Sequence, residues 1–454
     1  MAALTIHESD LPQAILFIVA LAAIVLFWPQ KINDAGTKMN LIRTSILTLI
    51  STAVKMAAGL VINKAVAVYI GPTGLALVGQ FQNFNQLMMT AAQGAINNGV
   101  TKYVAEYGKD GDRIPALLST AVRISLSSSA LVGLGIIVFA NYASTQILKS
   151  DHYGYIFVIL GFTISLFVLN NLLLSILNGL REIKIWVAIN IIQSIYGLIF
   201  TTLLIKFLGL DGILIALATN QSVIFFILLW MLRGHKIINL ENFKRPFDKP
   251  EAKKLAAFAA MAVVSAITVP VSHLVIRNYI GTTLGWDEAG YWQAMWYIST
   301  MYLMAVTTTL SIYYLPKLSE ITDKATIRSE LWHGYKIIMP LVAITSVGIF
   351  LMKDYIIALL FTNDFLPIRQ LFLWQLVGDV LKVASWLFAY LMVAKSMSKT
   401  FIVTEISFSL SLVLLARWLV GQYGLVGISY AFAANYAIYL IVIIFVTKRA
   451  WAGA

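Results

Sequence analysis

The sequence predicts an all-α integral membrane protein with twelve transmembrane helices in two six-helix bundles around a central cavity, plus one extra N-terminal transmembrane helix. Of its 454 residues, 59% are hydrophobic and only 12% are charged, whereas soluble domains carry about 25% charged residues. The apolar residues come in runs of about twenty, the length of helix that crosses about 30 Å of hydrocarbon. The runs lack the two-residue alternation of barrel strands, so we expect helices, which satisfy their own backbone groups in lipid.

The apolar runs and their polar punctuation place each span along the chain. An extra span is expected at about 12–28. The twelve main spans are expected at about 41–70, 78–101, 115–140, 153–178, 183–206, 211–232, 255–279, 289–315, 335–352, 368–394, 399–420 and 424–447.

The longest hydrophilic connection bisects the twelve spans and sets the domain organisation. We predict an N-terminal extension at 1–38, a six-helix bundle at 39–232, a cytoplasmic linker at 233–254 and a second six-helix bundle at 255–454. The halves echo each other: Tyr69-Ile70-Gly71 precedes Gly79-Gln80, and Tyr279-Ile280-Gly281 precedes Gly290-Tyr291. Two parallel repeats with the substrate between them are a transporter design.

Loop charges predict the orientation. Nineteen Lys and Arg residues fall in one set of loops and three, Lys149, Lys206 and Lys353, in the alternate set. Because basic loops stay in the cytoplasm, the C-terminus is predicted to be cytoplasmic in a bacterial inner membrane. The N-terminus is then periplasmic if the first run spans. Residues 1–38 have two interpretations. They are an accessory span, or they are an over-long chain start, since Met39 opens a complete twelve-span protein.

Composition and motifs exclude several other classes of function. The net charge of +12 lies in short loops, not on a solvated basic face, so no nucleic acid is expected. The absence of cysteine excludes disulfides and thiolate metal sites, and five unpaired histidines predict no metal site. Asp110-Gly111-Asp112 spells the Asp-x-Asp motif of metal-dependent glycosyltransferases, but Asp-Gly is common in turns and is interpreted as one here. The sequence contains no phosphate-binding glycine loop. We therefore expect a protein without cofactors that is not an enzyme.

Charged residues inside predicted spans are the first candidates for a site, because each costs roughly 2.5–3.5 kcal/mol at the bilayer centre. Lys55 lies half-way along the first span with no partner in that span, which favours a cavity role. Asp379 and Lys382 lie three residues apart on one helical face and could instead neutralise each other. Lys64, Arg277 and Arg417 lie near helix ends and are open to two interpretations, snorkelling to the interface or a buried role.

Neutral polar residues form stripes that predict an aqueous cavity. At 100° per residue, Gln82, Gln86, Gln93 and Asn97 share one face of the second span. A comparable stripe in the first span comprises Thr48, Thr52, Lys55, Gly59 and Asn63. Such stripes also join helices by hydrogen bonds, and that alternative stays open. Pro270 lies inside the seventh span, where it predicts a hinge for alternating access.

Four sequence strings carry a family resemblance. They are Asn98–Tyr103, Trp286–Gly290, Tyr314–Ser319 and Trp374–Val383. In this order they resemble the Wzx-type polysaccharide-unit flippases of the multidrug/oligosaccharidyl-lipid/polysaccharide exporter superfamily, nearest those that serve enterobacterial common antigen. The resemblance runs from about Leu41 to Arg449, and the N-terminal span departs from the family pattern.

The resemblance implies a fold of two six-helix bundles and a cargo. That cargo is an undecaprenyl-diphosphate-linked oligosaccharide, either the enterobacterial common-antigen unit or an O-antigen unit. Its implied route runs from the cytoplasmic to the periplasmic leaflet by alternating access. The partners expected with it are membrane lipid and the glycan polymerase and chain-length regulator of the same pathway, and the chain is expected to be a monomer.

Charge chemistry suggests roles for the candidate residues. We expect Lys55 to contact the diphosphate or an acidic sugar, with Arg123 and Lys382 as further candidates, since a point-charge lysine suits a phosphate that must be released. Asp379 and Glu405 could couple transport to a proton or sodium gradient. The membrane potential alone favours outward movement of anions by about 2.3 kcal/mol per charge per 100 mV.

Two other functions compete. A multidrug cation antiporter of the same superfamily would carry cationic cargo, against which a cavity rich in Lys and Arg argues. A membrane glycan polymerase would need catalytic groups in a sizeable outer loop, whereas the longest outer loop expected here is about 353–367.

Overall fold

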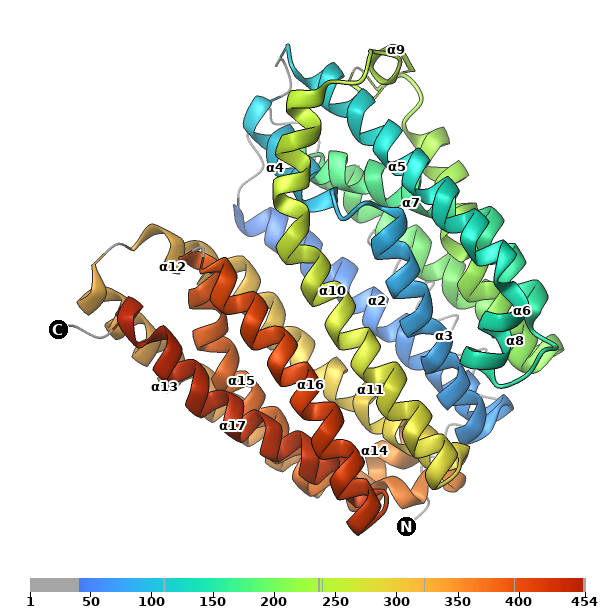
Figure 1. Cartoon of the computed structure of the whole chain (residues 1–454), viewed down its shortest axis with the longest axis vertical. Coiled ribbons are helices and arrows are strands. Elements are labelled where there is room, and N and C mark those ends of the chain that lie inside the picture. The colour runs from blue at the N-terminus through green and yellow to red at the C-terminus, as the bar shows by residue number, and fades with distance from the viewer. Residues whose placement is uncertain are drawn as a thin grey trace. The chain divides into compact units, whose positions relative to one another are not determined.

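The computed structural model is all-helical (Figure 1) and describes residues 41–108, 112–235, 237–238, 240–321, 323–395 and 397–451. The N-terminal span expected at 12–28 lies outside these residues. The first half of the chain forms α2 (Leu41–Tyr69), α3 (Gly71–Ala92), α4 (Asn97–Tyr107), α5 (Ile114–Val138), α6 (Ala140–Ala143), the π-helical η3 (Ser144–Leu148), α7 (Gly154–Gly179), α8 (Ile183–Met231) and α9 (Leu240–Phe243).

The second half begins with a long helix that carries the chain out of the predicted linker. Its elements are α10 (Lys249–Thr283), α11 (Trp286–Thr309), the π-helical η4 (Leu310–Tyr314), α12 (Leu315–Glu320), α13 (Lys324–Leu351), α14 (Lys353–Leu360), the 3₁₀-helical η5 (Asn363–Leu371), α15 (Phe372–Ala394), α16 (Ser398–Tyr423) and α17 (Val426–Trp451).

Eight of the described helices are long and apolar enough to cross a bilayer. One of them, α8, has 49 residues and would be about 74 Å long if it were straight, more than twice the hydrocarbon thickness. Gly209 interrupts it with φ 56° and ψ −126°, between the spans predicted at 183–206 and 211–232. The helical class is confirmed, while the count of twelve spans and their arrangement in two bundles stay predictions.

The second predicted span is broken. Between α3 and α4 the chain leaves the helix at Gly94 (φ 61°) and Ala95 (φ 52°), in the left-handed region that only glycine adopts without a steric penalty. The expectation that Gln82, Gln86, Gln93 and Asn97 share one face of a continuous helix is therefore wrong past Ala92. Gln93 and Asn97 still meet across the break, where Asn97 Nδ2 donates to Gln93 Oε1 at 2.9 Å.

The described chain divides into two compact units. The N-terminal unit takes its described residues from 41–70 and 80–266, and the C-terminal unit from 71–79 and 267–451. Within the N-terminal unit, α4, α5, α7 and α8 enclose a core of Leu, Ile and Val side chains, among them Leu117, Leu172 and Leu228. On α2, Val54 and Ala58 pack against Val187 and Ile191 of α8, so Lys55 falls beside this contact and is exposed.

The predicted cytoplasmic linker is held against α5 of the N-terminal unit. Ser119 Oγ donates to the carbonyl oxygen of Pro246 at 3.3 Å, and the backbone N–H of Asp248 donates to Thr120 Oγ1 at 3.0 Å. Arg123 Nη2 donates to the carbonyl oxygen of Arg245 at 3.1 Å. The connection between the sequence halves is thus an ordered strap rather than a free tether.

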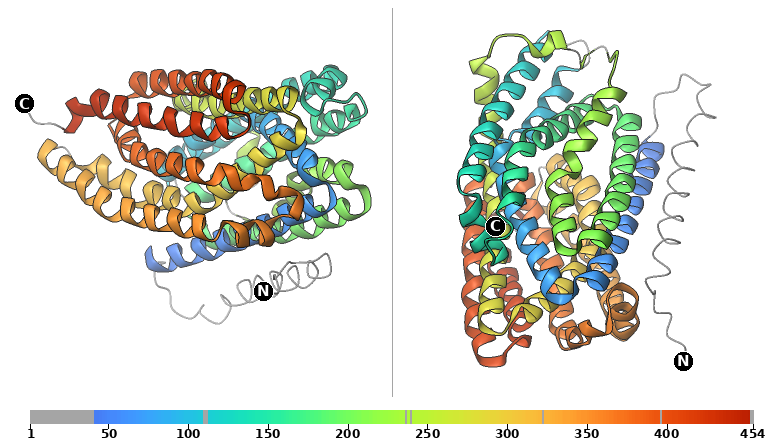
Figure 2. Two further views of the ribbon diagram at one scale, coloured as in Figure 1. Left: turned by 90° about the horizontal axis from the view of Figure 1, so that it is seen from below. Right: turned by 90° about the vertical axis from the view of Figure 1, so that its right-hand side faces the viewer.

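In the C-terminal unit, α15 is the central helix. It packs against α13, α16 and α17, and Figure 2 shows these helices running alongside one another. Its buried side chains include Val383, Leu387 and Leu391, which join a core with Tyr314 of η4 and Ile443 of α17. One face of α15 therefore builds the core, and the polar residues Asp379 and Lys382 are carried within the same helix.

Candidate substrate cavity

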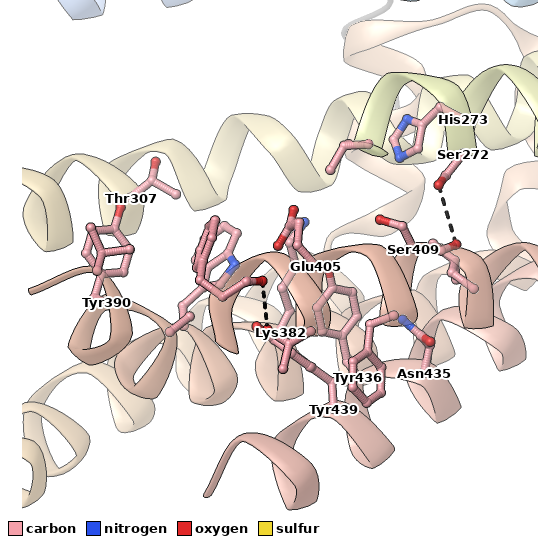
Figure 3. A pocket seen from close by; sticks show the side chains of 18 of the residues that line it. Ser272, His273, Thr307, Lys382, Tyr390, Glu405, Ser409, Asn435, Tyr436 and Tyr439 are labelled. Carbon is pink, nitrogen blue, oxygen red and sulfur yellow. Dashed lines mark hydrogen bonds between the residues drawn. The ribbon is translucent and has the colours of Figure 1, made fainter. Parts of the chain in front are cut away.

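The C-terminal unit contains a cavity of about 560 Å³ between α10, α11, α15, α16 and α17. Figure 3 shows polar and aromatic side chains converging on it from these helices. The lining residues that the argument uses are Lys382, Glu405, Trp296, Trp386, Asn435 and Tyr436. Cavities of this size with few polar groups on aromatic walls are typical of small-molecule sites.

Lys382 enters the cavity within a ring of aromatic side chains. Its Nζ lies 4.6 Å from the ring centroid of Trp296, 5.1 Å from that of Trp386 and 5.6 Å from that of Tyr436. Phe432 adds a fourth ring at 5.6 Å. An ammonium over an aromatic face gains about 2 kcal/mol or more when it is desolvated, so the rings offset part of the cost of placing this charge among membrane helices.

Glu405 of α16 lines the same cavity with the opposite charge. It is half-buried, and among the described residues the structure records no ion pair within 4 Å between Glu405 and Lys382. Nearby, Asn435 is 3% exposed and its Oδ1 has no hydrogen-bond partner in the described part of the chain. The cavity therefore presents a cation, a carboxylate and an amide oxygen that are available to a polar ligand.

Asp379 and Lys382 interact electrostatically, but among the described residues the structure records no ion pair within 4 Å between them. Asp379 Oδ2 accepts hydrogen bonds from Ser299 Oγ at 2.7 Å and from Tyr302 OH at 2.9 Å. The side chain is fully buried, and Oδ1 has no hydrogen-bond partner among the residues described. Two hydroxyls on α11 thus hold Asp379 Oδ2, while Lys382 Nζ lies over the aromatic rings of the cavity.

Arg277 lies deep in the same unit, so it has a buried role and does not snorkel to the membrane interface. It is 1% exposed and donates a hydrogen bond to Gln293 Oε1, with its guanidinium 5.4 Å from the ring centroid of Trp292. A Cβ on Gly79 would lie 2.6 Å from Gln293 Cδ, so glycine makes room for this pair. Arg417, by contrast, is exposed at the surface, as snorkelling requires.

The two sequence echoes meet inside the C-terminal unit. Asp287 Oδ1 accepts hydrogen bonds from the backbone N–H of Thr73 at 3.2 Å and from its hydroxyl at 2.6 Å. At Gly290 any Cβ would clash with the carbonyl oxygen of Pro72. The start of α3 therefore packs directly on the start of α11, which are the corresponding places of the two halves.

The remaining candidate residues do not line this cavity. Lys55, Gln82, Gln86 and Arg123 are exposed residues of the N-terminal unit, and Gln93 and Asn97 are half-buried there. Pro270 is buried inside α10, two residues before Ser272, which lines the cavity. Whether the N-terminal residues bind substrate and whether Pro270 acts as a hinge stay predictions.

The aromatic wall of the cavity is the part that sequence reasoning missed. On α15 the lining residues Lys382, Trp386, Ala389, Tyr390 and Val393 recur at helical spacing. That stripe is readable from the sequence, but the rings of Trp296 and Tyr436 come from other helices and no spacing on α15 predicts them.

Comparisons with known proteins agree with this architecture. Residues 41–322 match the family model described as polysaccharide biosynthesis protein. The lipid III flippase of Escherichia coli (strain K12) is 33% identical over 401 residues, which cover 88% of this chain and 96% of that protein.

Solved structures of other transporters share the fold. An inward-facing multidrug resistance MATE family transporter of the MOP superfamily superposes with a TM-score of 0.72 at 13% identity, covering 87% of this chain and 95% of the other. The lipid II flippase MurJ in an inward closed conformation gives a TM-score of 0.67 at 18% identity, covering 89% and 87%. By sequence, the chain belongs to the polysaccharide biosynthesis protein family.

Proposed function

We propose that this protein is a flippase for a lipid-linked oligosaccharide in the bacterial inner membrane. The observation that carries the proposal is the cavity of the C-terminal unit, where Lys382, Glu405 and aromatic rings face a space of about 560 Å³ among membrane helices. Sugar rings have flat apolar faces that pack on aromatic rings, and their hydroxyls need polar partners. The 33% identity to a lipid III flippase supports the same activity, and relatives of that kind are transporters rather than enzymes.

We infer the cargo more closely from the relatives. The cargo is an undecaprenyl-diphosphate-linked oligosaccharide, either the enterobacterial common-antigen unit called lipid III or an O-antigen unit. It moves from the cytoplasmic to the periplasmic leaflet by alternating access, with the C-terminus of the protein in the cytoplasm. The glycan polymerase and chain-length regulator of the pathway are proposed partners, and the chain is proposed to act as a monomer.

The charged residues take separate roles in this proposal. Lys382 contacts an acidic group of the glycan or the diphosphate in the cavity. Lys55 provides a second cationic contact from α2, and Arg123 a weaker one, since its guanidinium already binds the strap. The proposed groups for coupling to a proton or sodium gradient are Asp379 and Glu405. Of the two oxygens of the Asp379 carboxylate, one accepts hydrogen bonds and the other has no hydrogen-bond partner among the described residues.

The experiment that tests the flippase activity deletes the gene and identifies the lipid-linked oligosaccharide that accumulates. Accumulation of one undecaprenyl-diphosphate-linked glycan on the cytoplasmic side is expected, and plasmid-borne wild-type protein should clear it. An unchanged pool of lipid-linked glycans would contradict the proposal. Lys55→Ala and Lys55→Glu in the same strain test the cationic contact on α2, which full complementation by both variants would exclude.

A multidrug antiporter is the second candidate, favoured by the likeness to the MATE transporter fold. Its cargo is cationic, and Glu405 would then be the principal ligand in the cavity. Measuring drug resistance beside surface-glycan complementation separates the two. Loss of resistance in the deletion strain with normal surface glycan would favour the antiporter.

A further inference from the structure

A second pocket of the C-terminal unit lies away from the substrate cavity, between the first turns of α13 and the last residue of α17. Its volume is about 590 Å³. Six of its lining residues recur at helical spacing on α13 (Ala325, Arg328, Ser329, Trp332, His333 and Lys336), and Trp451 closes the other side. The opposite side of α13 buries Ile327 and Leu331 in the core. The six lining residues of α13 therefore face away from the core.

The stripe carries basic side chains. Arg328, His333 and Lys336 are exposed, and within the described residues none of the three takes part in an ion pair. Of the acidic residues nearby, Asp323 accepts both hydrogen bonds of Thr326, and Glu330 projects about 130° from the middle of the stripe at 100° per residue. The pocket therefore favours an anionic ligand.

Two tryptophans and an apolar surface indicate that this anion belongs to a lipid. Trp332 is 58% exposed, and the ring of Trp451 packs at a tilt of 46° against Phe388, with the ring centroids 5.8 Å apart. Tryptophan concentrates at membrane–water interfaces. In the following turns of α13 the exposed side chains are apolar apart from Thr345, with Ile344 71% and Leu351 75% exposed. A cationic headgroup pocket above a lipid-facing apolar helix matches an amphiphile better than a soluble phosphate.

We propose that this pocket binds the phosphate headgroup of an anionic phospholipid, whose acyl chains lie along α13. By the predicted orientation of the loops, the lipid belongs to the cytoplasmic leaflet. Arg328 and Lys336 are the phosphate ligands, and Trp332 and Trp451 flank the glycerol region. Basic pockets between membrane helices on the cytoplasmic side recognise lipid headgroups by this chemistry.

The test titrates the purified full-length protein in detergent with phosphatidylglycerol or phosphatidylcholine and follows each bound lipid by native mass spectrometry. Wild-type protein should bind phosphatidylglycerol more tightly than phosphatidylcholine. Each basic residue near a membrane surface changes binding roughly fivefold, so R328A/K336A should weaken phosphatidylglycerol binding about thirtyfold. R328K/K336R keeps both charges and should keep binding.

The matched control is K317A/K324A, which removes two exposed lysines from α12 and the first residue of α13 without touching the pocket. Its affinity for phosphatidylglycerol should stay within about twofold of wild type. An equal loss in the control, or equal affinity for phosphatidylcholine, would overturn the proposal. Displacement of the lipid by equimolar inorganic pyrophosphate would also overturn it, because the pocket would then be a soluble-anion site.

Discussion

At the scale of single residues, the environment of Lys382 decides what the cavity can bind. A lysine at the centre of a bilayer costs roughly 2.5–3.5 kcal/mol, and each desolvated aromatic contact returns about 2 kcal/mol. With rings at 4.6 Å and 5.1 Å, these two effects are of similar size. The rings therefore offset much of the cost of placing the ammonium among membrane helices, and the carboxylates of Asp379 and Glu405 also act on it electrostatically.

Lys382→Gln should lower transport of the glycan without unfolding the protein. A hydrogen bond to a charged group is worth about 1.5–3 kcal/mol, so the rate should fall roughly tenfold to a hundredfold. The measurement is restoration of surface glycan in the deletion strain at matched protein levels. The control is Lys399→Gln, an exposed lysine at the start of α16. Equal activity of the two variants would remove Lys382 from the site.

Gly290→Ala should destabilise the packing of α3 on α11, because its Cβ would meet the backbone carbonyl of Pro72. Overpacking of this kind costs about 1–3 kcal/mol, and backbone cannot give way as a side chain can. The control is Gly348→Ala on α13, where no atom lies within 4 Å of the added Cβ; it should gain about 0.5–1 kcal/mol from the lost glycine flexibility. Thermal unfolding in detergent measures both, and the same shift in each would contradict the prediction.

At the scale of elements, helix ends and breaks carry the polar chemistry. The break between α3 and α4 leaves Gly94 and Ala95 with left-handed backbone, and discontinuous helices of this kind occur in transporters where the backbone lines a cavity. The start of α13 is capped by a side chain. There Asp323 Oδ2 accepts the backbone N–H of Thr326 at 2.8 Å and its hydroxyl at 2.8 Å, an N-cap that fixes the helix carrying the lipid pocket.

The cap on α13 should make its stability depend on pH. Hydrogen bonds from Thr326, the backbone N–H first, hold the pKa of Asp323 below its usual range. A carboxyl with a lowered folded pKa stabilises the fold above its unfolded pKa, near 3.9, and loses that contribution as pH falls through the lower folded value. Asp323→Ala should lower the melting temperature at pH 7, and its difference from wild type should shrink as pH falls below about 3.9.

Asp323→Asn is the informative partner to that variant. The amide oxygen can still cap the helix but does not titrate, so the melting temperature of Asp323→Asn relative to wild type should rise as pH falls toward 3. If Asp323→Ala were as destabilising at pH 3 as at pH 7, the ionised cap would not be the cause.

At the scale of the whole molecule, the strap of residues 233–254 ends in a buried carboxylate. Glu251 is 2% exposed and accepts hydrogen bonds from Tyr107 OH at 2.8 Å and from Lys254 Nζ at 2.8 Å. Lys254 Nζ also donates to Tyr107 OH at 2.7 Å. Its hydrogen bond to Glu251 first, and the one to Tyr107 second, raise the pKa of Lys254. One residue thus joins the end of α4 to the start of α10, where the chain passes from one sequence half to the other.

Glu251→Gln should destabilise the N-terminal unit by about 1–3 kcal/mol, the cost of leaving buried polar partners unsatisfied. The matched control is Glu241→Gln, an exposed residue of α9 on the same strap, which should change stability by less than about 0.5 kcal/mol. Unfolding of the purified protein in detergent measures both, and equal effects would mean that the strap is not anchored at Glu251.

The features that could be predicted from the sequence are those that depend on residues close together in the chain. The helical ranges could be predicted because each depends on about twenty consecutive apolar residues. The break at Gly94–Ala95 could not, since a single glycine in a helix is tolerated and gives no clear signal. The spacing of Asp379 and Lys382 suggested a pair, but Ser299 and Tyr302, some eighty residues away, compete for the carboxylate.

The sequence by itself determined that this chain is an all-helical membrane protein, that it resembles oligosaccharide-lipid flippases, and which charges lie inside its spans. These properties are local, because hydropathy and motif identity are read over short stretches. Only the tertiary structure decided that Lys382 sits among rings from α11, α15 and α17, and that Arg277 is buried rather than snorkelling. Those outcomes depend on which distant helices pack together, and packing is set by the whole chain at once.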